Sequence, residues 1–364
     1  MRTIMPIDHI PDWQSRLDRQ DAFWRNAVLD RPVCVMTVHQ PNADYPYPEA
    51  GPWKQPRDRW FDTEYHARMA RACVMNTAYL GDALPYAFPN LGPEVFSAFM
   101  GQELDFGDAT SWSIPCIHDW SDADAMVFRP DNVYFQQIMA MTDAMLEAGR
   151  GVFYTGITDL HPGADAIAAF RDPAEMNVDM LESPDEIRTL LDRVNRTYFD
   201  VYDRFYNHLC SAAQAITSWP GIVSRVKWYV PSNDFSCMIS KRMFDEFFLP
   251  GIQLECQHME ANIYHLDGPQ ALQHLDSLLS IRELNAIQWV CGAGNGRATD
   301  WMPVYERIQA AGKGMQVGLM PDELDLFMER IAPEGVWLSV SVGSVDEAQA
   351  VLARVSRWTA KGKY

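Results

Sequence analysis

The chain lacks any apolar stretch that could cross a membrane. No run within its 364 residues approaches the roughly 20 consecutive apolar residues that a transmembrane helix needs. Residues 1–20 mix charges, prolines and a tryptophan, without the apolar core of a secretory signal. The seven cysteines form no Cys-x-x-Cys pair, so neither a disulfide framework nor a thiolate zinc finger is indicated. We therefore expect a cytoplasmic protein with reduced cysteines and no membrane contact.

Basic residues are also scarce. Lys and Arg total 30 against 49 Asp and Glu, a net charge of −19. Nucleic acids and anionic membrane surfaces would repel such a chain, so neither is an expected partner. The sequence has no Gly-x-Ser-x-Gly, His-Glu-x-x-His or Walker motif, which disfavours serine hydrolases, zincins and P-loop enzymes. The glycine-rich stretch Gly292–Gly296 follows a late strand, and we interpret it as a flexible loop rather than a dinucleotide site.

What the sequence does contain is a regular alternation of strand and helix patterns in its last third. Each of five β-rich runs is followed by a helical pattern, which is typical of a parallel sheet. The predicted strands are Arg225–Val230, Asn262–Leu266, Ala286–Val290, Met315–Leu319 and Val336–Ser341. The helices predicted to follow them are Arg242–Glu260, Pro269–Ser280, Trp301–Ala311, Asp322–Ile331 and Val345–Val355.

Three more strands are predicted upstream, at Arg31–Val38, Tyr79–Tyr86 and Val152–Ile157. Three plus five is eight, the strand count of a (β/α)₈ barrel. The predicted fold class is therefore α/β, a single (β/α)₈ TIM barrel, with an open doubly wound sheet as the alternative. We expect an N-terminal helical extension over residues 1–30 and the barrel over residues 31–364.

Two insertions are predicted in this barrel. The segment Gln40–Pro56 is rich in Pro, Tyr and Gly and predicts a long loop after strand 1. The segment Ala174–Ser218 predicts extra helices between strands 3 and 4, divided near Ser183 and Pro184. Long loops of this kind often wall or cover a substrate.

The sharpest chemical signal is the pair His265 and Asp267. Functional groups of a barrel come from the carboxyl ends of its strands. These residues are two apart at the end of a predicted strand, so they point to the same face. An imidazole beside a carboxylate can bind a metal or transfer a proton. In the alternative, Asp267 caps the next helix and His265 is hydrogen-bonded in the core, and the spacing favours neither reading.

Other strand ends supply weaker candidates, each with a structural alternative. The aspartates fit local turns and caps, and the tryptophans fit core packing. The 12 Trp, 14 Tyr and 17 Phe are also numerous enough to line a pocket for a flat or apolar ligand. These candidates are His39, Asp82, Asp159, Trp228, Asp234, Trp289 and Asn295.

From about Arg31 onward, the order of the motifs resembles the uroporphyrinogen decarboxylase-like superfamily. That group includes the decarboxylase and zinc-dependent methyltransferases that take methyl groups from corrinoid proteins. The resemblance implies a single (β/α)₈ barrel. The matching motifs are Arg31-Pro-Val-Cys-Val-Met, Leu80-Gly-Asp82-Ala-Leu-Pro, Gly156 to Asp172, Ser232-Asn-Asp234 with Phe248-Leu-Pro250, and Tyr264-His265-Leu-Asp267-Gly268.

The resemblance also assigns roles to single residues. Asp82 matches the position of the decarboxylase's catalytic aspartate, but the arginine-containing loop that grips the substrate's carboxylates is replaced by Thr37–Asn42. His265 matches a zinc ligand of the methyltransferases, with Asp267 in place of their first cysteine. Ser339 and Ser341 occupy the eighth-strand region, where no cysteine is present. Zinc activates a thiol substrate best when its ligands are rich in sulfur, so a site without cysteine is less suited to that reaction.

These observations lead to one functional hypothesis and two rivals. We expect a methyltransferase- or demethylase-like enzyme acting on a small substrate, with a corrinoid protein as partner, and with a homodimer as one oligomeric state open to it. The rivals are a metal-independent decarboxylase or lyase, and a non-catalytic ligand-binding barrel. The predicted catalytic residues are His265, Asp267 and Asp82; the substrate-binding residues are His39, Asp159, Trp228, Trp289 and Asn295; and the ligands of a divalent metal, zinc first, are His265, Asp267 and Asp234.

Overall fold

A seven-stranded, mostly parallel sheet forms the centre of the molecule. The computed structural model describes residues 2–358. The strands are arranged in the order β2-β1-β11-β10-β9-β8-β7, and every neighbouring pair is parallel except β1 with β2. These strands are β1 (Val33–His39), β2 (Thr77–Gly81), β7 (Trp228–Tyr229), β8 (Ala261–Asp267), β9 (Ala286–Val290), β10 (Gly314–Leu319) and β11 (Val336–Val340).

Two small sheets complete the strands. β3 (Tyr86–Ala87) pairs in parallel with β6 (Tyr154–Thr155), and β4 (Glu103–Phe106) pairs antiparallel with β5 (Ser111–Ile114). Over residues 2–358, the β3–β6 pair is a separate sheet, so backbone pairing does not run as one closed ring. The structure therefore confirms the mixed α/β fold with a parallel-rich central sheet.

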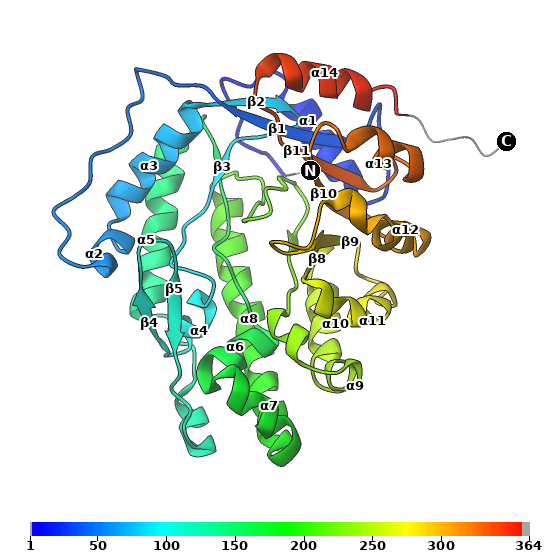
Figure 1. The fold of residues 1–364 in the computed structure, drawn as a ribbon. Coiled ribbons are helices and arrows are strands. Elements are labelled where there is room, and N and C mark those ends of the chain that lie inside the picture. Colours follow the sequence, from blue (N-terminus) through cyan, green and yellow to red (C-terminus); the bar gives the residue numbers. More distant parts are fainter. Residues whose placement is uncertain (1, 359–364) are drawn as a thin grey trace.

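Helices follow one another around the outside of the strands (Figure 1). Within the described residues, none of them is long and apolar enough to cross a membrane. Short 3₁₀ turns cover Trp120–Ala125, Asp234–Met238, Pro269–His274 and Ala298–Trp301. The helices are α1 (Trp13–Phe23), α2 (Pro56–Trp60), α3 (Thr63–Met75), α4 (Val95–Phe99), α5 (Val133–Ala148), α6 (Gly163–Arg171), α7 (Pro173–Glu182), α8 (Pro184–Ser211), α9 (Lys241–Met243), α10 (Leu249–His258), α11 (Leu275–Leu279), α12 (Met302–Ala310), α13 (Leu324–Arg330) and α14 (Val345–Val355).

Most predicted elements of the last third are confirmed to within a residue or two. β9 and α14 have the predicted bounds, whereas β7 covers only two residues of its predicted run. The predicted helix Arg242–Glu260 is divided into α9, a π-helical turn at Phe244–Phe248 and α10. The long loop after β1 is also present. The predicted helical segment Ala174–Ser218 corresponds to α7 and α8, which are divided at Ser183 as predicted, although α8 ends at Ser211.

The prediction of one strand over Tyr79–Tyr86 is wrong. The segment contains the end of β2, which is antiparallel to β1, and the start of β3, which pairs with β6. Gly81 ends β2 with a φ of +63°, and a Cβ there would lie 2.2 Å from the carbonyl oxygen of Cys34. Only glycine fits such a position, so the chain turns away from β1 at this point.

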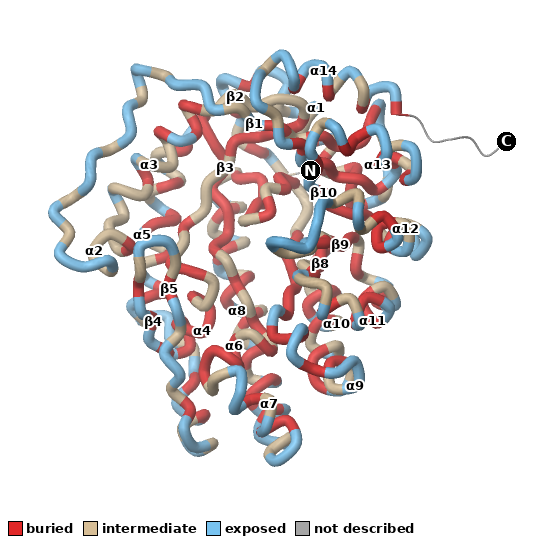
Figure 2. Tube along the Cα trace, in the orientation of Figure 1, coloured by how far each residue is buried: buried red, intermediate tan, exposed pale blue. Residues whose placement is uncertain are grey.

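Residues ahead of β1 pack against the strands. The rings of Trp24 and Trp228 lie 5.2 Å apart, and both side chains are buried. The fully buried amide of Gln20 donates to the carbonyl oxygen of Asp82 and accepts from the backbone N–H of Val223. Figure 2 shows buried residues along the strands and exposed residues on the loop between β1 and α2.

Candidate active site

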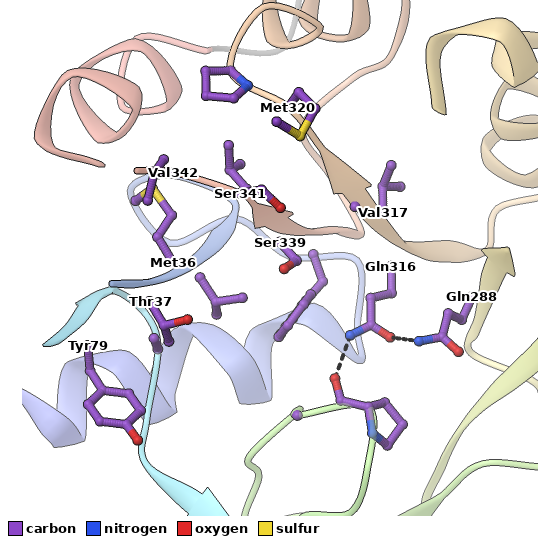
Figure 3. A pocket seen from close by; sticks show the side chains of 18 of the residues that line it. Met36, Thr37, Tyr79, Gln288, Gln316, Val317, Met320, Ser339, Ser341 and Val342 are labelled. Atoms are coloured by element: carbon purple, nitrogen blue, oxygen red, sulfur yellow. Dashed lines mark hydrogen bonds between the residues drawn. The ribbon is translucent and has the colours of Figure 1, made fainter. Parts of the chain in front are cut away.

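A cavity of about 930 Å³ opens beside the carboxyl-terminal halves of β1, β9, β10 and β11 and the residues that follow them. Figure 3 shows side chains from these strands and from β2 gathered around one space. Large apolar side chains form most of its walls, together with the hydroxyls of Thr37, Ser339 and Ser341. The apolar members include Met36, Tyr79, Tyr86, Trp219, Trp289, Met320 and Trp337.

Positive charge is missing from these walls. Among the described residues that line the cavity there is no Lys, Arg, His or Asp, and the one acidic residue is the exposed Glu347. Burial raises the pKa of the Tyr79 and Tyr86 hydroxyls, which therefore stay neutral at physiological pH. A polyanionic substrate would find no charge partner in these walls. An apolar, neutral or cationic molecule needs no such partner and is compatible with them.

A chain of amide hydrogen bonds links His265 to this cavity. Nδ1 of His265 lies 2.5 Å from Oε1 of Gln288, and the Gln288 amide donates to Oε1 of Gln316 over 2.8 Å. The Gln316 amide in turn donates to the carbonyl oxygen of Pro220 over 2.8 Å (Figure 3). Both glutamines line the cavity. The ring of Trp219 meets the imidazole edge to face at 5.0 Å.

This chain determines which nitrogen of His265 carries a proton. The Pro220 carbonyl can only accept, so the Gln316 side chain must direct its NH₂ group towards Pro220 and its oxygen towards Gln288. By the same logic the oxygen of Gln288 faces His265, whose Nδ1 must donate to it. The neutral imidazole therefore has a free lone pair on Nε2, as a proton acceptor requires.

Sequence reasoning missed Gln288 and Gln316. A signal was present, because each is a lone amide inside an apolar strand, in Ala-Ile-Gln-Trp-Val and Met-Gln-Val-Gly-Leu. A polar side chain in a strand that is buried on both faces needs a hydrogen-bond partner. What the sequence did not contain was the register that places Gln288 opposite both His265 and Gln316.

The other predicted residues are dispersed. Trp289 lines the large cavity, and Asp267 is exposed at the end of β8. His39 is exposed at the end of β1 and is not among the residues lining the cavity. Asn295 lies in an exposed loop and donates to the carbonyl oxygen of Cys291. Trp228 is fully buried, and its indole N–H donates to the carbonyl oxygen of Ile216.

Asp82 lies in a buried ion-pair cluster. Its carboxylate pairs with both Nη atoms of Arg31 and with Arg19, and it accepts from the backbone N–H of Cys34 over 2.9 Å. Asp82 is completely buried and Arg31 is 8% exposed. Both carboxylate oxygens are thus engaged away from the walls of the large cavity, which indicates a structural role for this group.

Asp159 and Asp234 belong to a second cluster. Oδ1 of Asp159 lies 2.9 Å from Nε2 of His161, and Asp165 accepts from the backbone N–H groups of Asp234 and Phe235. Loss of hydration, and then the neighbouring Asp165, raises the pKa of Asp234, with a smaller opposite effect of His265. Asp234 therefore senses His265 electrostatically, but its close neighbours are Asp165 and His161.

The predicted metal ligands do not form a coordination site. Over residues 2–358, no group of three or more His, Cys, Asp or Glu side chains is placed to hold a metal ion. Nδ1 of His265 is occupied by Gln288, Asp267 is exposed, and Asp234 lies with Asp165. The eighth-strand region contributes the hydroxyls of Ser339 and Ser341, which are poor zinc ligands. This donor set does not fit zinc.

Comparison with known proteins gives a fold and no family. No protein-family profile matches the sequence, and no curated protein matches it either. Among solved structures, the chain is similar to a methyltransferase from Methanosarcina mazei, with a TM-score of 0.60 and 12% sequence identity, over 93% of this chain and 97% of that chain. At this identity the likeness shows a shared overall fold, so what the chain has in common with that methyltransferase is its architecture.

Proposed function

We propose that this chain is a methyltransferase- or demethylase-like enzyme whose small substrate binds in the 930 Å³ cavity. The observation that carries the proposal is the fixed tautomer of His265, which does not itself line the large aromatic cavity but is hydrogen-bonded to its wall residue Gln288 at the carboxyl ends of parallel strands. In folds of this kind that end of the sheet is where substrates react. The likeness to a methyltransferase supports the same reading.

The walls restrict the substrate. Aromatic rings and the thioethers of Met36 and Met320 suit an apolar or aromatic body. Because Glu347 is the one Asp, Glu, His, Lys or Arg among the described lining residues, we propose a substrate that is neutral or positively charged. A decarboxylase substrate with several carboxylates would find no partner there, which argues against the lyase alternative together with the pairing of Asp82 to Arg31.

His265 is the proposed proton carrier. In demethylation of a donor R–X–CH₃, the C–X bond breaks with its electron pair on the heteroatom X. A nucleophilic acceptor takes the methyl group, and X takes a proton from Nε2 of His265, which must first have picked up that proton from solvent; the neutral ring protonated on Nδ1 is left behind. In the opposite direction Nε2 removes that proton. Gln288 and Gln316 are positioning residues, since they hold the imidazole through Nδ1.

Two finer statements belong to this proposal. We propose that the β3–β6 pair supplies the second and third strands of a (β/α)₈ barrel of the uroporphyrinogen decarboxylase-like type. We also propose that the methyl acceptor or donor is a corrinoid carried by a partner protein. No step assigned to the residues of this chain depends on a metal.

A substrate screen tests the function. Purified protein is mixed with small O-, S- and N-methyl aromatic compounds, and binding is followed by quenching of tryptophan fluorescence, since Trp219, Trp289 and Trp337 line the cavity. Loss of the methyl group is followed by mass spectrometry, with a reduced corrinoid as acceptor.

The variants separate catalysis from binding. We expect His265→Ala to lower turnover by about 10²- to 10⁴-fold with little change in binding. His208→Ala is the matched control, because this histidine lies partly exposed on α8 and pairs with Asp143. Full turnover in His265→Ala would refute the assigned role. A compound that binds tightly but is never demethylated by any acceptor would support the ligand-binding alternative.

A further inference from the structure

A second cavity, of about 320 Å³, lies between α4, α6 and the 3₁₀ turn Asp234–Met238. It shares no lining residue with the large cavity. Three of its wall residues are carboxylic acids, Glu94, Asp165 and Asp234, and one is His161. Apolar side chains, including Phe235 and Met238, form much of the remaining wall.

The imidazole of His161 balances part of this negative charge. Nε2 lies 2.9 Å from Oδ1 of Asp159, and Nδ1 lies 3.7 Å from Oδ2 of Asp165. Burial opposes protonation of the ring, but these two carboxylates together hold the pKa of His161 well above its usual range. Asp159 and Asp165 share this one imidazolium, and the described residues that line the cavity include no Lys or Arg to pair with Glu94 or Asp234.

Two buried polar atoms at this cavity have no hydrogen-bond partner among residues 2–358. The side chain of Ser97 is 1% exposed, and within the described residues its hydroxyl makes no hydrogen bond. One carboxylate oxygen of Glu94, Oε2, is likewise buried without a partner. Both residues line the cavity. Buried polar atoms of this kind are nearly always satisfied, so a ligand that donates hydrogen bonds would suit the space that both residues line.

We propose that the second cavity binds a small organic ammonium ion, held by Glu94 and Asp234 and by the hydroxyl of Ser97. An ammonium group donates hydrogen bonds, which is what Oε2 of Glu94 and the Ser97 oxygen lack. The apolar wall formed by Phe235, Met238 and the neighbouring prolines then covers the hydrocarbon part of the ligand. Asp234 is exposed, so the cavity is open to an entering molecule.

A bare metal ion fits less well. Over residues 2–358, no group of three or more His, Cys, Asp or Glu side chains is placed to hold a metal ion, and that includes the acids of this cavity. The space is also an order of magnitude larger than the roughly 30 Å³ that one water occupies, and half of its surroundings are apolar. An anion would face three carboxylic acids and no Lys or Arg among the described lining residues.

The test is a titration of the full-length protein with n-butylammonium chloride, followed by calorimetry and ligand-detected NMR. Sodium n-butyrate and 1-butanol match its chain length and serve as anionic and neutral probes. We expect saturable binding of the ammonium ion only. A charge-assisted hydrogen bond is worth about 1.5–3 kcal/mol, so Glu94→Gln should weaken binding roughly 10- to 100-fold.

Matched variants locate the bound ion. Asp234→Asn, at an exposed position, should weaken binding in the same way, and Ser97→Ala should weaken it about 2- to 10-fold. Glu347→Gln, at the rim of the large cavity, should leave it unchanged. Circular dichroism checks that each variant is folded. No saturable binding, equal binding of butyrate, loss of binding only in Glu347→Gln, or displacement of butylammonium by stoichiometric Mg²⁺ or Zn²⁺ would each overturn the proposal.

Discussion

The buried carboxyl group of Glu255 should make the stability of this protein depend on pH. Glu255 lies on α10 and is 2% exposed, and its Oε2 has no hydrogen-bond partner within the described residues. Burial, and then the charge of Asp165, raises its pKa from 4.5 to about 8. The group is therefore a neutral acid at pH 7 in the folded chain and a carboxylate in the unfolded one.

The sign and the size follow from this shift. Between pH 4.5 and about pH 8 the folded chain holds a proton that the unfolded chain has released, so stability falls as the pH rises through this window and then levels off. Each pKa unit corresponds to 1.36 kcal/mol, which sets an upper limit of roughly 5 kcal/mol on the loss. We expect on the order of 2–5 kcal/mol, since local relaxation and water entry reduce the effect.

The perturbation is Glu255→Gln, which keeps the shape of the protonated acid but does not ionise. Urea denaturation at several pH values between 5 and 9 measures the free energy of unfolding of both proteins. The two should be similar near pH 5, and the variant should become the more stable one as the pH rises. Glu260→Gln, at an exposed neighbouring position, should follow the wild-type curve. Parallel curves for Glu255→Gln and wild type would refute the reasoning.

Further outcomes follow from the same structure. Asp82→Asn leaves the buried Arg31 without its partner and should lower the free energy of unfolding by about 3–5 kcal/mol; a stably folded variant without turnover would instead make Asp82 catalytic. Ser339 is exposed in the large cavity, so Ser339→Phe should abolish ligand binding in the fluorescence assay while melting like wild type; unchanged binding would place the substrate elsewhere. Dialysis against a chelator should leave turnover unchanged, and loss that zinc restores would contradict this. Deleting residues 2–30 removes the partner of Trp228 and the buried Gln20, so cooperative unfolding should be lost; a normal melting curve would argue against this packing.

The strands of the last third could be predicted because burial alone specifies them. Residues such as Ile287, Val317 and Leu338 are completely buried in parallel strands, and continuous apolar runs are the sequence form of that environment. The break at Gly81 could not be predicted in the same way. It depends on the carbonyl oxygen of Cys34, which approaches only after β1 and β2 have paired.

The candidate site was harder to predict because its contacts join distant parts of the chain. The partners of Asp82 are 51 and 63 residues away, so no local motif could show that its carboxylate is already engaged. The sequence around Asp82 suggests a capping or turn-forming role, but its carboxylate is held by the two arginines instead. Whether a charged residue at a strand end belongs to a functional site or to a structural ion pair depends on which residues the fold places next to it.

The same reasoning explains why His265 and Asp267 separate in function. Their spacing of two does put them on one face, but β8 ends at Asp267, whose side chain is exposed, while His265 lies deeper beside β9. The imidazole is hydrogen-bonded to the side-chain amide of Gln288 on β9, and Gln288 is hydrogen-bonded to the amide of Gln316 on β10. The Gln316 amide donates in turn to the carbonyl oxygen of Pro220. That carbonyl cannot donate, so each link has one orientation, and the tautomer of His265 is determined across three strands rather than along one. A search for partners of a candidate histidine in a parallel sheet should therefore begin with polar residues in the neighbouring strands.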